Sequence, residues 1–150
     1  MKPILRDIQN TVVKFLRDNE DSQNIDIIPR GLSSIENLQL HHYKQIQPTQ
    51  LHVSYPIPLQ SAADISGLFW NKIALQLTLI KKYTLMEDVS AYEQTEQISY
   101  ILSHQPLITP SWEVCFELNY QNPWKDLTNQ TLWQAIQMNF TSSKFNLSFA

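Results

Sequence analysis

The residues best suited to metal chemistry in this chain are its four histidines. His41 and His42 are adjacent, so their side chains diverge on a helix or a strand and lack the spacing of four that a helical metal pair needs. His52 and His104 could join either of them only through the fold. These positions favour structural or surface histidines, and we expect no metal site.

Cys115 is the one candidate nucleophile, and the chain has no second cysteine for a disulfide. It alternates with Glu113 and Glu117, which a strand would place on the same face. Neighbouring carboxylates disfavour the thiolate that nucleophilic chemistry requires. The two glutamates could do acid–base work, but a solvated strand face or an acidic contact surface explains them more simply.

Glycine is scarce, with two residues in the whole chain, Gly31 and Gly67. Loops that cradle phosphates need several glycines so that backbone amides can approach the ligand. Neither a Walker loop nor a dinucleotide-binding fingerprint can be written in this sequence. We therefore expect no cofactor and no catalytic activity.

Length and charge limit the classes of protein to which this chain could belong. The 150 residues predict one domain over 1–150, and the 43% apolar content is enough for a packed core. A formal net charge of −3 argues against sequence reading of nucleic acid. No signal peptide or long apolar run is present, which predicts an intracellular protein without a membrane contact.

Periodicity predicts an α+β fold built on a mostly antiparallel sheet of four to five strands. An N-terminal helix and a second helix are expected to pack on one face of that sheet. The predicted helices cover 3–18 and 90–103, and the predicted strands cover 24–29, 51–59, 68–83, 111–120 and 131–140. Along 111–120 the side chains of Trp112, Val114, Phe116, Leu118 and Tyr120 are predicted to share one face.

Several features point to a protein that binds or assembles. Pro56 and Pro58 place the second half of strand 51–59 at an edge or outside the sheet, because proline cannot donate to a ladder. Trp124 and Lys125 follow Pro123 in a turn-like stretch, where a tryptophan more often packs back onto its own domain but is also enriched at interfaces. With Trp70, these residues form the candidate assembly surface.

Two further segments could become ordered on assembly. Residues 30–48 form a long polar loop, and residues 141–150 form a C-terminal tail that could be flexible. Long loops inside a small domain are commonly functional.

The order of these elements resembles the small tail terminator, or tail completion, proteins of long-tailed bacteriophages. The match runs from Ile4–Leu16 through Leu51–Leu59, Phe69–Tyr83 and Ala91–Ser103 to Trp112–Tyr120 and Leu132–Phe140. The resemblance implies a homo-oligomeric virion structural protein, usually a hexameric ring, assembled in the bacterial host cytoplasm. Such a ring would cap the tail tube and contact tube, sheath and neck proteins.

Two alternatives fit the same residues. A small acidic chain without a cofactor could be an immunity protein that binds and neutralises a basic toxin, because its charge would steer that association. A general adaptor or scaffold subunit is the other. A toxin partner with a persistent monomer would favour the first, and ring formation would favour the terminator.

Overall fold

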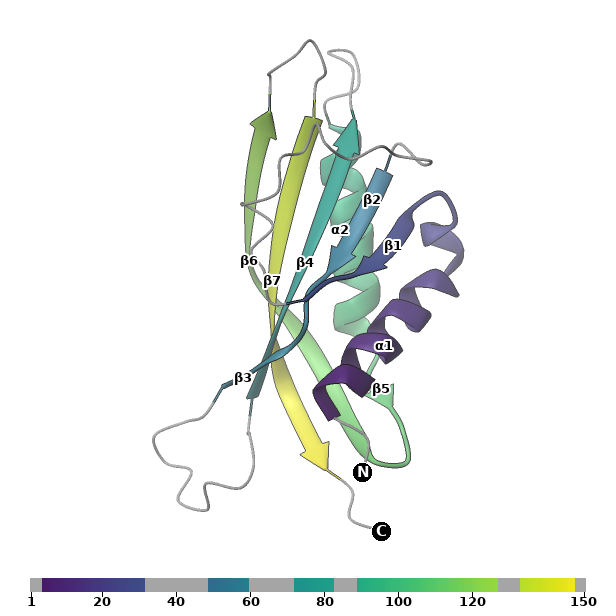
Figure 1. The fold of residues 1–150 in the computed structure, drawn as a ribbon, viewed down its shortest axis with the longest axis vertical. Coiled ribbons are helices and arrows are strands. Elements are labelled where there is room, and N and C mark those ends of the chain that lie inside the picture. Colours follow the sequence, from purple (N-terminus) through teal and green to yellow (C-terminus); the bar gives the residue numbers. More distant parts are fainter. Residues whose placement is uncertain (1–3, 32–48, 60–71, 83–88, 127–132, 148–150) are drawn as a thin grey trace.

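The computed structural model describes residues 4–31, 49–59, 72–82, 89–126 and 133–147, which form one curled sheet with helices against it (Figure 1). The helical elements are α1 (Ile4–Arg17), the short 3-10 helix η1 (Glu20–Ser22) and α2 (Ser90–His104). The strands are β1 (Asp26–Pro29), β2 (Thr49–Val53), β3 (Ile57–Leu59), β4 (Lys72–Lys82), β5 (Leu107–Ile108), β6 (Trp112–Asp126) and β7 (Trp133–Leu147).

The sheet has seven strands in the order β1-β2-β4-β7-β6-β5, and β3 pairs with β4 beside this path. The α+β class is confirmed. The expected size is wrong, because the sheet has more than four to five strands. Its pairing is antiparallel, as mostly expected, except between β1 and β2, which run parallel and make the sheet mixed. Periodicity merged β3 with β2 and missed β5, because strands of three and two residues are too short for an alternating pattern to be read.

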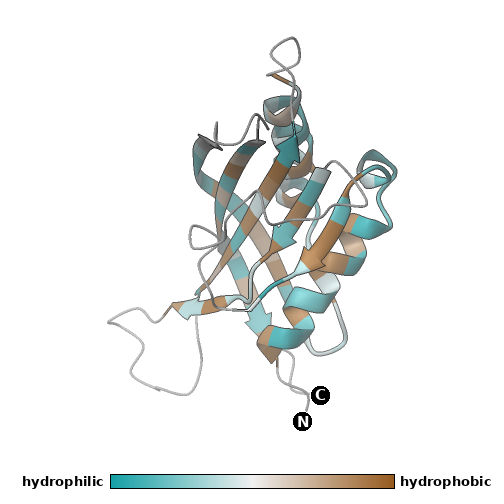
Figure 2. Cartoon of the chain, turned by 45° about the horizontal axis from the view of Figure 1, so that its top comes forward, coloured by the Kyte–Doolittle hydropathy of each residue, from teal (hydrophilic) through white to brown (hydrophobic). Residues whose placement is uncertain are grey.

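Both helices pack on the same face of the sheet, as predicted. Residues of α1 and α2 share one buried cluster with the inward residues of the strands. In α1, Ile8, Val12 and Leu16 recur every four residues and are fully buried, and burial of each such side chain is worth about 1.5–3 kcal/mol. Figure 2 shows apolar and hydrophilic positions alternating along the long strands, as expected for strands with one face on this core.

Gln9 fixes α1 over the β1–β2 end of the sheet. Its buried Nε2 donates to the carbonyl of Arg30 at 2.7 Å and to that of Val53 at 3.0 Å. Further along the helix, Arg17 donates from Nη2 to the carbonyl of Ile27 at 2.7 Å. Three backbone acceptors at the ends of β1 and β2 are therefore satisfied by one helix.

The predicted strand 51–59 is two strands. β2 is buried on both faces rather than half-buried, and it ends at Val53. The chain then passes through the buried Pro56 into β3, where the half-buried Pro58 pairs with Ile73 at one end of β4. The proline-bearing half therefore stays in the sheet and, among the described residues, pairs on one side only, with β4, in agreement with the first of the two expectations, an edge position.

The second helix extends over the predicted residues 90–103 and ends one residue later, at His104. The residue at the N-cap is Val89, whose side chain makes no capping hydrogen bond, and Ser90 is already helical. Within the described residues, neither helix is long and apolar enough to cross a membrane.

Candidate assembly surface

A groove crosses the side of the sheet opposite α1 and α2, which we call the helix-free face. Its cavity volume is about 310 Å³. The lining side chains come from the link between β2 and β3, from β3 itself and from β4, β6 and β7. They include Tyr55, Ile57, Gln76, Asn119, Tyr120 and Asn139. None of the described residues that line it is charged. Such a groove suits an uncharged protein surface rather than an ionic ligand.

Tyr120 reaches this groove because of an irregularity in β6. The register between β6 and β7 shifts between Leu118 and Tyr120, which leaves Asn119 as an extra residue. Leu118 pairs with Phe140 of the core, whereas Tyr120 pairs with Asn139 on the helix-free face. The prediction that Tyr120 shares the face of Trp112 is therefore wrong, and its side chain is 61% exposed.

Side-chain amides form the polar floor of the groove. Gln76 donates from Nε2 to Oδ1 of Asn139 at 3.2 Å, and Asn119 donates from Nδ2 to Oγ1 of Thr141 at 2.9 Å. The Nδ2 atom of Asn139 is buried and has no hydrogen-bond partner among the described residues. A buried amide donor without an acceptor is costly, and a partner that supplied a carbonyl here would remove that cost.

The rim opposite Tyr120 is aromatic and aliphatic. Ile57 in β3 is 51% exposed, a large share for an isoleucine. Tyr55 carries the guanidinium of Arg6 over its ring, 5.3 Å from the centroid. This cation–π contact orients Tyr55 at the edge of the groove.

The outer edge of β6 is open over most of its length. On that side β5 pairs only with Glu113 and Val114. From residue 115 to 126, β6 pairs with β7 on one side, and no strand of the described chain covers the other. An uncovered edge of this length presents backbone donors and acceptors to any strand that can reach it.

The residues that the sequence suggested for an assembly surface are only partly brought together. Pro56 is buried, and Pro58 lies in β3 next to the groove residue Ile57. Trp124 and Lys125 are not in a turn, because β6 continues through them and pairs them with Ala135 and Gln134. Their side chains, and the whole of Trp70, lie outside the described residues.

Two predicted flexible segments have different outcomes. The loop expected over 30–48 lies outside the described residues from position 32 onwards. Residues 141–147, expected in a C-terminal tail, continue β7, and 148–150 lie outside the described residues.

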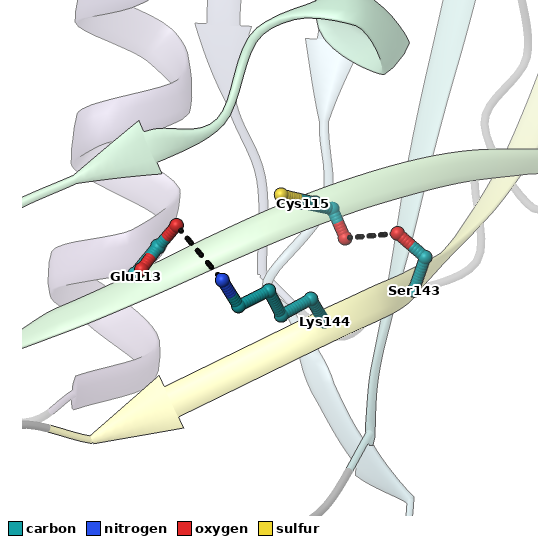
Figure 3. Close-up of polar contacts among 4 residues, drawn as sticks. All are labelled: Glu113, Cys115, Ser143 and Lys144. Carbon is teal, nitrogen blue, oxygen red and sulfur yellow. Dashed lines mark hydrogen bonds and ion pairs between the residues drawn. The ribbon is translucent and has the colours of Figure 1, made fainter.

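The candidate nucleophile Cys115 lies half-buried on β6 at a second register shift, between Cys115 and Phe116 (Figure 3). Directly across from it is Lys144, whose Nζ lies 3.4 Å from Oε1 of Glu113. The hydroxyl of Ser143 donates to the Cys115 carbonyl at 3.4 Å. These contacts hold the β6–β7 pair together, and they include no histidine that could act as a base on the thiol.

The fold strongly perturbs the pKa of His52, a titratable group on the helix-free face. It is 2% exposed, and its Nε2 lies 3.0 Å from Oε1 of Gln50. Burial, and then the charge of Arg30, lower the pKa of His52 from 6.5 to about 4. His52 is therefore neutral at pH 7. The described residues contain no group of three or more His, Cys, Asp or Glu that could hold a metal ion.

The sequence matches no protein-family model and no curated protein. Among solved structures, the chain is similar to the bacteriophage SPP1 gp17 protein, with a TM-score of 0.49 and 15% sequence identity. The alignment covers 93% of this chain and 91% of that one.

Proposed function

We propose that this chain is a structural assembly protein that forms a closed ring of identical subunits. The observation that carries the proposal is the uncovered edge of β6, with the exposed Tyr120 beside an uncharged groove. Proteins usually protect such an edge with lysines, short strands or a covering segment. Between residues 115 and 126 this edge has one lysine, Lys125, which lies near its end, and two acidic residues, Glu117 and Asp126.

The shape of the sheet favours a head-to-tail contact. The two ends of the main sheet are different, because β1 has four residues in a parallel pair and β6 has fifteen in an antiparallel pair. If the β6 edge of one subunit binds a different surface of the next, the first subunit still has that other surface free and the second still has its β6 edge free. Further copies can bind at both. When the rotation between subunits closes, the product of such contacts is a ring.

For the role of the ring we propose that of a phage tail terminator. The order of helices and strands along the sequence supports this role. In that role the ring would cap the tail tube and join it to the neck, with tube, sheath and neck proteins as partners. The protein would assemble in the host cytoplasm and remain in the virion, without catalysis, a cofactor, a membrane contact or reading of nucleic acid sequence.

A substitution at the β6 edge tests the proposal. Tyr120→Lys places a charge beside the uncovered edge, and we expect it to prevent ring formation because burying an unpaired lysine in an interface is unfavourable. Asn146→Lys is the matched control, since Asn146 is exposed on β7 at the other end of the β6–β7 pair, across from Glu113. Negative-stain imaging should show rings for the unmodified chain and the control but none for Tyr120→Lys. Rings of normal abundance for Tyr120→Lys would contradict the proposed use of this edge.

A further inference from the structure

We propose, on the basis of the assembly proposed above, that the outer face of α2 in one subunit docks into a groove beside α1 in the next. This second groove lies between α1 and β5 and has a volume of about 390 Å³. The occupant we assign to it is a second copy of this chain.

The α1–β5 groove combines an apolar floor with one cation. Phe15 of α1 and Leu107 and Ile108 of β5 line it, and Ile108 is 67% exposed. Lys14 contributes the cation, and Asp18 contributes one carboxylate further along the helix. An exposed isoleucine next to a half-buried phenylalanine is a surface that a partner's aromatic side chain can cover.

The outer face of α2 has the complementary composition. Tyr92, Glu96, Tyr100 and His104 recur every four residues and are all exposed, so they form one stripe along the helix. Tyr100 is 62% exposed and stacks on His104 with the ring centroids 3.9 Å apart. Stacking holds the aromatic pair in place, which lowers the entropy lost when a partner covers it.

The charges of the two helices are opposite. Helix α2 contains Glu93 and Glu96 and has no lysine or arginine, whereas α1 contains three basic residues and one acidic residue. Among the described residues the one ion pair is Lys144–Glu113, so Lys14 and Glu96 are not paired within the subunit. In the proposed contact, Glu96 of one copy faces Lys14 of the next, and Tyr100 covers the apolar floor.

The contact is heterologous, because the α2 stripe and the α1–β5 groove are different surfaces of the same chain. Each subunit would use its stripe toward one neighbour and its groove toward the other, as a ring requires. Because charged side chains lie in this contact, its strength should fall as salt is added.

Charge exchange tests this contact. The double substitution Glu93→Lys/Glu96→Lys and the single substitution Lys14→Glu should each raise the concentration for half-assembly by roughly tenfold or more, because like charges then face each other. The triple variant that combines them exchanges the two signs and should recover most of the assembly. Glu20→Lys, at an exposed position in η1, is the control and should assemble normally. Circular dichroism on each variant checks that the fold is kept.

The possible outcomes separate the two proposals. Rings that form normally with the double and single variants would overturn the α2–groove contact and leave the ring itself standing. Weakened assembly that the triple variant restores supports the contact. If the restored species is a closed dimer, the contact is supported and the ring is contradicted. A wild-type chain that stays monomeric at every concentration would overturn both.

Discussion

Trp112 donates its indole N–H to the carboxylate of Asp7, at 2.8 Å between Nε1 and Oδ2, although the two residues are 105 positions apart. Trp112 begins β6 and is buried, and Asp7 lies in the first turn of α1. The bond therefore joins the start of β6 to the helix that packs at the β1 end of the sheet. It holds the start of β6 against α1 and so helps to keep the sheet curled. Helix α1 also lines the groove proposed to receive α2.

Removal of this carboxylate should measurably destabilise the fold. We expect Asp7→Ala to lower the free energy of unfolding by about 1–3 kcal/mol, because the buried indole N–H loses a charged acceptor. Asp18→Ala, at an exposed position just after the other end of α1, should change the free energy of unfolding by less than about 0.5 kcal/mol. Urea denaturation followed by tryptophan fluorescence measures both. Equal losses for the two variants would show that the bond contributes nothing specific.

Gln134 is a polar residue in a site that an apolar one should fill better. It is 0% exposed, and neither its Oε1 nor its Nε2 has a hydrogen-bond partner among the described residues. Gln134→Met keeps the side-chain length and removes the unpaired amide, so it should raise the free energy of unfolding by about 1–3 kcal/mol. Gln97→Met, at an exposed position on α2, is the control and should have little effect. A less stable Gln134→Met would mean that the amide does have a partner.

His52 should make the fold sensitive to mild acid. Because its pKa falls from 6.5 to about 4 on folding, the unfolded chain binds a proton between these pH values that the folded chain does not. The stabilisation of the folded state linked to neutral His52 is fully present above pH 6.5. It is lost as the pH falls toward 4, which lowers the free energy of unfolding by up to about 3 kcal/mol. Urea titrations at pH 4.5 and pH 7 measure how much the free energy of unfolding falls between the two pH values. This fall should be smaller for His52→Gln than for the unmodified chain. An unchanged difference would assign the acid sensitivity to other groups.

The long elements of the fold could be predicted from the sequence because each has a clear period. The four-residue spacing of α1 and the alternation along β4 are both found where they were expected. The parallel pairing of β1 with β2 was missed because four residues carry no information on strand direction. The burial of His52 was missed because alternation with Leu51 and Val53 made it an outward residue of a half-buried strand.

The candidate surface was harder to predict than the fold, and Tyr120 shows why. Its sequence position continues the apolar alternation of β6, and one extra residue at Asn119 moves it to the opposite face. Whether a strand takes a bulge is decided by its pairing with β7 over many residues, which local periodicity does not contain. The edge position of Pro58 could be predicted, because the lack of a backbone N–H is a property of proline itself and does not depend on the rest of the fold.

Assembly of this chain into a ring can be tested by the mass of the unmodified chain in solution. Sedimentation velocity over a range of concentrations, with and without tail tube, would measure it. If the proposed ring has six subunits, the number implied by the resemblance to tail terminators, we expect a species of about 105 kDa, six copies of the 17.5 kDa chain. This species should dissociate as the salt concentration rises. A species of 17.5 kDa at every concentration, unchanged by tail tube, would contradict self-assembly as the function of this protein.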